Sequence, residues 1–253
     1  MLATDYKLLL EKRLLSLLDV GDPVLKRAAI YSTMAPSKRI RPLIVLSIAD
    51  EKALDAACAI EMLHTYSLIH DDLPAMDDDD TRRGQPSLHI QEDEATAILT
   101  GDFLLTYAFE LLSPFTDVVK CVAQKLGASG ILGGQIKDLA AKNRSIDLDQ
   151  YMLIAKQKTG ALFAAAAMTG GYLAGAALSQ ISLLERFGET FGLLFQIKDD
   201  LSDRAETSSI QSILPEKDCL SLLNELKIET LDLIEKLSLP SDYLRSITDA
   251  FFS

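Results

Sequence analysis

Residues 53–80 read ALDAACAIEMLHTYSLIHDDLPAMDDDD, and this stretch predicts a long helix that ends in aspartates. Residues 53–72 are rich in Ala and Leu and contain no Gly or Pro, so nothing in them interrupts a helix. Pro74 then bends the chain, and we expect the bend to return Asp77 towards Asp71. The stretch therefore predicts an all-helical segment with a group of carboxylates at its tip.

A second aspartate cluster occurs far downstream, where residues 195–203 read FQIKDDLSD. Gln196, Asp199 or Asp200, and Asp203 recur at helical spacing, so an amide and several carboxylates share one helix face. Like charges at this spacing repel, and the C-terminal end of a helix disfavours anions. Such a conflict is typical of a functional site, and a divalent cation would relieve it.

Carboxylate oxygens are hard ligands that suit Mg²⁺, which keeps several waters and takes few protein ligands together with substrate phosphates. Both aspartate clusters follow apolar runs with a helical pattern. We therefore expect two carboxylate-tipped helices to face one another and to hold Mg²⁺ and a diphosphate.

Helical patterns fill most of the remaining chain, and no sustained alternation of apolar and polar residues predicts a strand. The predicted helices cover residues 8–18, 43–50, 53–72, 95–112, 118–132, 135–143, 149–157, 160–177, 182–201 and 217–237. No linker, fixed repeat or low-complexity tract marks a boundary, so an all-α fold with a single domain over residues 1–253 is predicted.

Composition narrows the function class. A net charge of −12 argues against nucleic acid or an anionic membrane as a partner. The cysteines, Cys58, Cys121 and Cys219, lack metal-type spacing, which is typical of reduced thiols in the cytoplasm. Charged residues interrupt the N-terminal leucines, so no signal peptide is predicted. Residues 159–184 carry no charge, but they are mostly small, which favours a packed interior helix pair over a membrane span.

Basic residues lie close to the aspartates in this acidic chain. The segment KRIRP (38–42) precedes the first cluster, and Arg82-Arg83-Gly84 follows it. Lys158-Thr159-Gly160 is predicted to open a helix, where free N–H groups and a cation favour phosphate. Residues 77–80 alone would be read as a solvated acidic loop, but these neighbouring cations favour a phosphate site.

Six motifs together resemble the motif series of short-chain trans-polyprenyl diphosphate synthases, and most resemble that of bacterial farnesyl diphosphate synthases. Their order and spacing match over about residues 5–204. They are residues 37–42 (SKRIRP), 69–84 (IHDDLPAMDDDDTRRG), 101–102 (GD), 133–135 (GGQ), 158–162 (KTGAL) and 195–200 (FQIKDD).

The resemblance implies antiparallel helices around a deep central cavity, in a homodimer. It also implies a Mg²⁺-dependent enzyme that adds isopentenyl diphosphate head-to-tail to dimethylallyl and then geranyl diphosphate. Three Mg²⁺ ions are expected when substrate is bound. The departing diphosphate is the expected base, so no side-chain general base is required.

The resemblance also assigns roles to individual residues. The implied metal ligands are Asp71, Asp72, Asp77, Asp199 and Asp203. Arg82, Lys158 and Gln196 resemble residues that hold the allylic substrate, and the Thr159 hydroxyl and Gln196 amide are expected to stabilise the allylic cation. The residues that resemble an isopentenyl diphosphate site are Lys38, Arg41, His64 and Arg83.

Product length is expected to depend on the helical turn before Asp71, where a side chain acts as the floor of the cavity. Tyr66 and Ser67 lie there. A bulky Tyr66 together with Pro74-Ala75 resembles bacterial farnesyl synthases and predicts a C15 product. Met62 and Leu63 would form a deeper floor, which keeps a C20 geranylgeranyl product as the alternative.

The chain also departs from the family pattern. Pro36-Ser37 replaces two glycines before the basic motif, and the segment after Asp203 lacks the usual lysine motif that closes over the allylic diphosphate. These departures keep open a weakly active or non-catalytic regulatory subunit. A terpene cyclase is a third hypothesis, but the intact second aspartate cluster argues against it.

Overall fold

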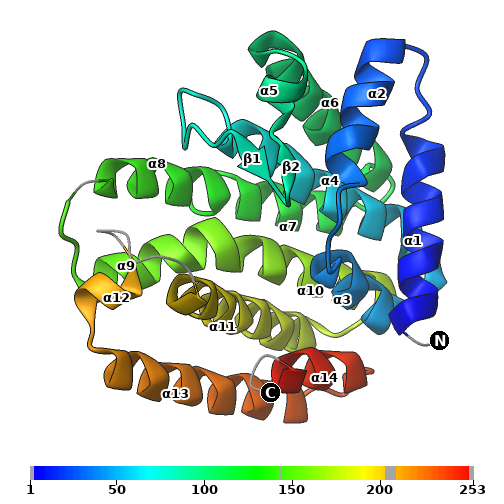
Figure 1. Cartoon of the computed structure of the whole chain (residues 1–253). Helices are drawn as coiled ribbons and strands as arrows, with labels where there is room; N and C mark the ends of the chain where they lie inside the picture. Colours follow the sequence, from blue (N-terminus) through cyan, green and yellow to red (C-terminus); the bar gives the residue numbers. More distant parts are fainter. Residues whose placement is uncertain (1–2, 143, 203–208, 251–253) are drawn as a thin grey trace. The chain divides into compact units, whose positions relative to one another are not determined.

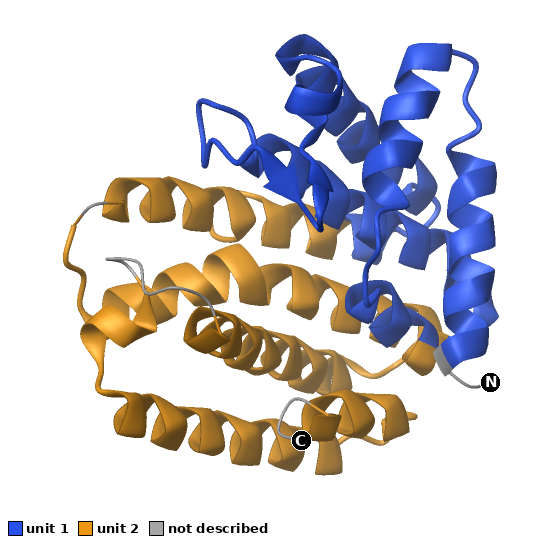
Figure 2. Ribbon diagram, in the orientation of Figure 1, with its two compact units in different colours: residues 1–46, 50–119 blue, residues 47–49, 120–253 orange. Residues whose placement is uncertain are grey.

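The computed structural model describes residues 3–142, 144–202 and 209–250. Its regular elements are helices, with one two-stranded antiparallel hairpin, so the predicted all-α class is confirmed (Figure 1). The chain divides into two compact units: residues 1–46 with 50–119, and residues 47–49 with 120–253 (Figure 2). We call them unit 1 and unit 2. A single domain over the whole chain stays a prediction.

Unit 1 is built around α4 (Leu54–Asp71), whose residues Ala56–Leu63 are all buried. α4 packs against α6 (Glu94–Leu112) and α1 (Ala3–Leu17). The remaining elements of this unit and its boundary are α2 (Pro23–Thr33), α3 (Ile40–Ala49), η1 (Glu51–Ala53), β1 (Thr81–Arg82), β2 (Gln85–Pro86), α5 (Leu88–Gln91) and α7 (Thr116–Leu126). The first aspartate cluster therefore lies at the end of a largely buried helix.

Unit 2 is built around α11 (Leu178–Ser202), which packs against α10 (Ala161–Ala174) and α13 (Glu216–Glu235). The ring of Phe163 lies edge-on to that of Phe191, with 5.2 Å between centroids. The other elements are α8 (Ile131–Ala141), α9 (Leu148–Ala155), the π-helical turn η2 (Lys156–Gly160), α12 (Ile210–Ile213) and α14 (Asp242–Ala250). The second aspartate cluster lies at the end of this central helix.

Several predicted element boundaries are wrong. The helix expected over 118–132 ends at Leu126, because the segment 127–130 (GASG) contains two glycines and forms a turn before α8. The buried leucines are Leu10 and Leu14 of α1 and Leu18 just after its end, whereas Leu8 and Leu15 are exposed. The predictions also omitted α2, α5, α12, α14 and the hairpin.

One helix among the described residues, α6, is long and apolar enough to cross a membrane by length and composition alone. The core helix of a soluble protein passes the same test, and α6 packs against α4, so this is weak evidence for a span. In the uncharged run 159–184, residues Ala161–Gly171 of α10 are buried and pack against α11, as predicted.

Candidate functional site

The chain folds back on itself at the end of α4. The backbone N–H of Asp77 donates to the carbonyl of Asp71 at 2.9 Å, and the N–H of Asp79 donates to the carbonyl of Asp72 at 3.2 Å. Asp78 has a φ of 57°, a left-handed conformation that a short polar side chain tolerates. The predicted return of Asp77 towards Asp71 is thus confirmed.

Asp72 is engaged by Arg82 and is only 3% exposed. Arg82 Nε donates to Asp72 Oδ1 at 2.9 Å, and Arg82 Nη2 donates to the same oxygen and to Asp79 Oδ2. Burial raises the pKa of the Asp72 carboxyl above its usual value, and the hydrogen bonds from Arg82 oppose that shift. In this structure Asp72 therefore orients Arg82, while Asp71 and Asp77 are more open to solvent.

The β1–β2 hairpin that follows directs the side chain of a second arginine, Arg83, towards His64. Arg82 pairs with Gln85, so the connection has only two residues, Arg83 (φ 55°) and Gly84 (φ 80°). Positive φ at both positions defines a type I′ turn, the geometry that matches the twist of a tight hairpin. The turn separates the two neighbouring arginines, because the side chain of Arg82 reaches Asp72 whereas that of Arg83 reaches His64.

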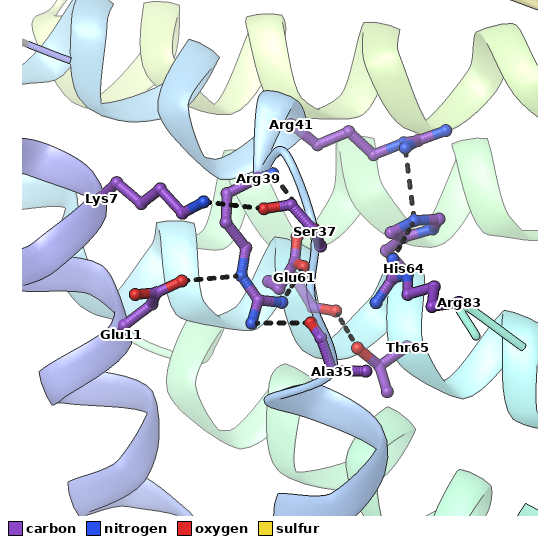
Figure 3. Close-up of polar contacts among 10 residues, drawn as sticks. All are labelled: Lys7, Glu11, Ala35, Ser37, Arg39, Arg41, Glu61, His64, Thr65 and Arg83. Atoms are coloured by element: carbon purple, nitrogen blue, oxygen red, sulfur yellow. Dashed lines mark hydrogen bonds and ion pairs between the residues drawn. The ribbon is translucent and has the colours of Figure 1, made fainter. Parts of the chain in front are cut away.

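Two guanidinium groups converge on His64 (Figure 3). Arg41 Nη1 lies 3.4 Å from His64 Nε2, and Arg83 Nη2 lies 3.3 Å from the same nitrogen. Burial, and then Arg41 and Arg83, lower the pKa of His64 well below its usual value, so the ring is neutral and its Nε2 accepts. Burial likewise lowers the pKa of Arg83. A bound anion would relieve this cluster, and the exposed Lys38 lies close to it in sequence.

A buried ion pair supports the loop that carries Lys38 and Arg41 (Figure 3). Arg39 is 2% exposed, and its Nη1 donates to Glu61 Oε1 at 2.5 Å. The Ser37 hydroxyl accepts from the Arg39 N–H at 3.1 Å, and Lys7 Nζ donates to the Ser37 carbonyl at 2.9 Å. These contacts hold Ser37 in place within the loop. Sequence reasoning missed Arg39 and Glu61, because nothing local marks a charged pair as buried.

In unit 2 the segment that carries Lys158 and Thr159 was expected to start a helix. It instead forms the π-helical turn η2 between α9 and α10. Residues 155 and 160 are both right-handed helical, so no exposed helix N-terminus binds phosphate here. A Cβ added to Gly134 of α8 would lie 2.5 Å from the Lys158 nitrogen. The glycine thus allows α8 to pack directly against η2. Such π-helical turns frequently occur at functional sites.

The predicted site residues of unit 2 are brought together around this turn. Lys158 Nζ donates to Asp138 Oδ2 at 2.5 Å. Thr159 Oγ1 donates to Gln196 Oε1 at 2.6 Å, and Gln196 Nε2 donates to Asp200 Oδ1 at 2.8 Å. Asp199 is exposed at the end of the same helix, α11.

No group of three or more His, Cys, Asp or Glu side chains is arranged to hold a metal ion within residues 3–142, 144–202 and 209–250. Mg²⁺ fits the residues present, because it is usually bound by one or two carboxylates with substrate phosphates and waters rather than by a complete protein cage. A backbone hydrogen bond joins the main chains of Asp71 and Asp77, and the carboxylates of both residues are hard oxygen donors. The predicted ligand Asp203 lies outside the described residues.

The residues expected to set product length lie on the last two turns of α4. Tyr66 is 5% exposed, and its ring meets that of His70 edge-on at 5.8 Å between centroids. The His70 ring occupies the space beside Gly101, whose added Cβ would lie 2.1 Å from His70 Nε2. Ser67 donates to the His64 carbonyl. His70 thus supports the ring of Tyr66.

Comparisons with known proteins agree with the motifs. The polyprenyl synthetase family profile matches residues 22–212. The farnesyl diphosphate synthase of Bacillus subtilis is 41% identical over 202 residues, which cover 74% of this chain and 68% of that protein. The geranylgeranyl diphosphate synthase of Cyanophora paradoxa is 45% identical over 193 residues, which cover 70% of this chain and 64% of that protein.

Solved structures agree as well. A crystal structure of geranyltransferase from Helicobacter pylori matches with a TM-score of 0.87 at 30% identity, over 100% of this chain and 99% of that one. The same enzyme complexed with magnesium and isoprenyl diphosphate matches with a TM-score of 0.82 at 29% identity, over 98% and 97% of the two chains. The predicted resemblance is therefore confirmed, and the chain belongs to the polyprenyl synthetase family of trans-prenyltransferases.

Proposed function

We propose that this trans-prenyltransferase condenses isopentenyl diphosphate head-to-tail with dimethylallyl and then geranyl diphosphate, and that it releases farnesyl diphosphate. One observation carries the proposal: unit 1 presents two groups of opposite character. Asp71 and Asp77, whose main chains are joined by a hydrogen bond, supply carboxylates at the end of α4, and Arg41 and Arg83 form a cationic group around the neutral His64. A condensation of two diphosphates has use for one site that holds metal and one that does not.

The metal-bound diphosphate is assigned to the allylic substrate. In unit 1 the proposed Mg²⁺ ligands are Asp71 and Asp77. In the second aspartate cluster they are Asp199 and Asp203. When bound, Mg²⁺ neutralises the diphosphate and makes it a better leaving group. Asp72 was predicted as a ligand, but its carboxylate already accepts from Arg82, so we assign it to hold that arginine against the allylic diphosphate.

The isopentenyl diphosphate is assigned to Arg41, His64 and Arg83, with Lys38. Arginine forks bind phosphate oxygens in a bidentate manner, and the neutral imidazole is free to donate once a diphosphate occupies the two guanidinium groups. The lowered pKa of His64 is consistent with the assignment, because after burial its main cause is the positive charge of the neighbouring arginines, which a bound anion would offset. No Mg²⁺ is required at this group.

Unit 2 supplies polar groups for the reacting carbons. Lys158 would hold the allylic diphosphate after leaving Asp138, and the oxygen atoms of Thr159 and Gln196 would stabilise the allylic cation as fixed dipoles. The double bond of isopentenyl diphosphate attacks C1 of the allylic cation. A proton then leaves C2 of the isopentenyl unit. The departed diphosphate is the base, so the protein needs no general base of its own.

A C15 product is favoured over C20 because Tyr66 is buried and held by His70 on the turn before Asp71. A deeper floor at Met62 and Leu63, both fully buried, would instead give a geranylgeranyl product. We also propose a homodimer. Ile98 and Leu99 on α6 are 43% and 62% exposed, and a second copy of the chain would cover them.

The test is the rate of incorporation of labelled isopentenyl diphosphate into an allylic primer by purified protein. With Mg²⁺ present, Asp71→Asn should lose at least about 100-fold in rate, because a ligand to the leaving group is removed. The matched control is Asp117→Asn on the exposed first turn of α7, which should retain the wild-type rate. Equal rates for the two variants would refute the metal assignment.

A further inference from the structure

Tyr151 of α9 is a buried aromatic residue with one polar contact. It is 4% exposed, and its ring lies in the apolar cluster that contains Leu193, Leu194 and Ile197 of α11. Its hydroxyl nevertheless donates to Asp200 Oδ2 at 2.8 Å. Phe would fill the same space in this cluster, so the hydroxyl serves the carboxylate of Asp200 rather than the packing.

Asp200 belongs to the second aspartate cluster, but its carboxylate is used inside unit 2. Oδ2 accepts from Tyr151 and, at 3.1 Å, from the backbone N–H of Ile210. Oδ1 accepts from Gln196 Nε2 at 2.8 Å. Both oxygens are therefore fixed by protein donors, whereas the neighbouring Asp199 is exposed to solvent. The two adjacent aspartates have different roles, which their identical chemistry in the sequence does not reveal.

The carboxylate of Asp200 decides which way the amide of Gln196 points. Its Oδ1 accepts only from the NH₂ group, so the amide oxygen must point the other way, where the Thr159 hydroxyl donates to it at 2.6 Å. A flipped amide would place its oxygen against a carboxylate, an unpaired contact between two acceptors. Because the Thr159 proton is committed to Gln196, the lone pairs of Thr159 point away from this bond.

We propose that Tyr151 is a positioning residue: through Asp200 it fixes the amide of Gln196 and thereby the direction of the Thr159 oxygen. This inference rests on the proposed function, in which Thr159 and Gln196 stabilise the developing cation. The chain of hydrogen bonds runs Tyr151, Asp200, Gln196, Thr159, and each bond lies within unit 2. Tyr151 touches no substrate, so it acts on kcat by orientation alone.

Tyr151→Phe tests the proposal by removing one oxygen. Loss of a hydrogen bond to a charged group predicts a decrease in kcat of about 10- to 100-fold. The KM for isopentenyl diphosphate should not change, because that substrate is assigned to residues of unit 1. The matched control is Tyr243→Phe on α14, a tyrosine whose hydroxyl makes no described hydrogen bond and which should keep the wild-type kcat.

Two further comparisons separate positioning from general damage. In a Gln196→Ala background the amide is gone, so adding Tyr151→Phe should change kcat no further; an additive loss would overturn the proposal. Independently of turnover, urea unfolding of Tyr151→Phe, Asp200→Asn and the double variant should show strong coupling, and additive midpoints would overturn the hydrogen-bond chain. A wild-type protein without turnover would overturn the proposed function. If the wild type is active and Tyr151→Phe has the same kcat, only the role of Tyr151 would be overturned.

Discussion

Gly134 is the residue through which α8 packs against the turn η2, so Gly134→Ala has a quantitative expected effect. The new methyl group would lie 2.5 Å from the backbone nitrogen of Lys158 and 2.8 Å from the carbonyl carbon of Gln157. Both are backbone atoms, so no side chain can rotate away. An ordinary contact begins at 3.4 Å, and η2 must therefore move by nearly 1 Å relative to α8.

Stability and activity should respond differently to this displacement. Ala is a better helix former than Gly by about 1 kcal/mol, while overpacking costs about 1–3 kcal/mol, so the net loss of folding free energy is small. Lys158 and Thr159 move with the turn, and a misplacement of about 1 Å can cost about 100-fold in rate. We therefore expect Gly134→Ala to remain folded and to lose about two orders of magnitude in kcat.

Steady-state condensation with labelled isopentenyl diphosphate, together with urea unfolding, measures both quantities. Gly21→Ala is the matched control, because an added Cβ there meets nothing within 4 Å and its φ is not positive. That variant should equal the wild type in rate. If Gly134→Ala condensed substrates as fast as Gly21→Ala, the claim that this glycine positions the catalytic turn would be wrong.

Three further perturbations have expected outcomes. Tyr66→Ala should shift the product beyond C15, as measured by mass spectrometry, and an unchanged product would remove Tyr66 as the cavity floor. Because the folded state lowers the pKa of His64, the unfolded chain binds the proton more readily, so the free energy of unfolding should fall from pH 7.5 to 5.5, by at most about 1.4 kcal/mol per pH unit. His64→Gln should reduce that slope in urea titrations at the two pH values; an equal slope would contradict the buried, cation-flanked histidine. Arg39→Met should destabilise the fold by about 3–5 kcal/mol in thermal unfolding by leaving Glu61 buried and unpaired, and Arg39→Met with Glu61→Gln should recover part of this; no recovery would contradict the ion pair.

Local rules were sufficient for most of the long helices and for the ends of α4 and α11. Helix formers without Gly or Pro predicted α4 almost to the residue, and Pro74 predicted the return of Asp77. The hairpin was missed because strands of two residues have no alternating pattern, although Arg83-Gly84 supplies the positive φ values of its turn. The continuous path from α9 through η2 to α10 was missed because a π-turn has no distinct residue signature.

Site chemistry was predictable by residue type but not by partner. The arginines, the lysine and the aspartates stay candidates, and their sequence positions do not distinguish Asp72, which holds Arg82, from Asp71. Likewise, Asp200 holds Gln196 while Asp199 is exposed. These differences between adjacent aspartates depend on contacts with residues 10 or more positions away, such as Tyr151, and no local sequence pattern encodes them.

The central claim is that the chain joins isopentenyl units to an allylic diphosphate and stops at C15. The most direct measurement is the mass of the product that purified protein forms from dimethylallyl and labelled isopentenyl diphosphates, with Mg²⁺ and with EDTA. Farnesyl diphosphate carrying two labelled units is expected with Mg²⁺, and no product is expected with EDTA. A protein that leaves both substrates unchanged under either condition would contradict the central claim.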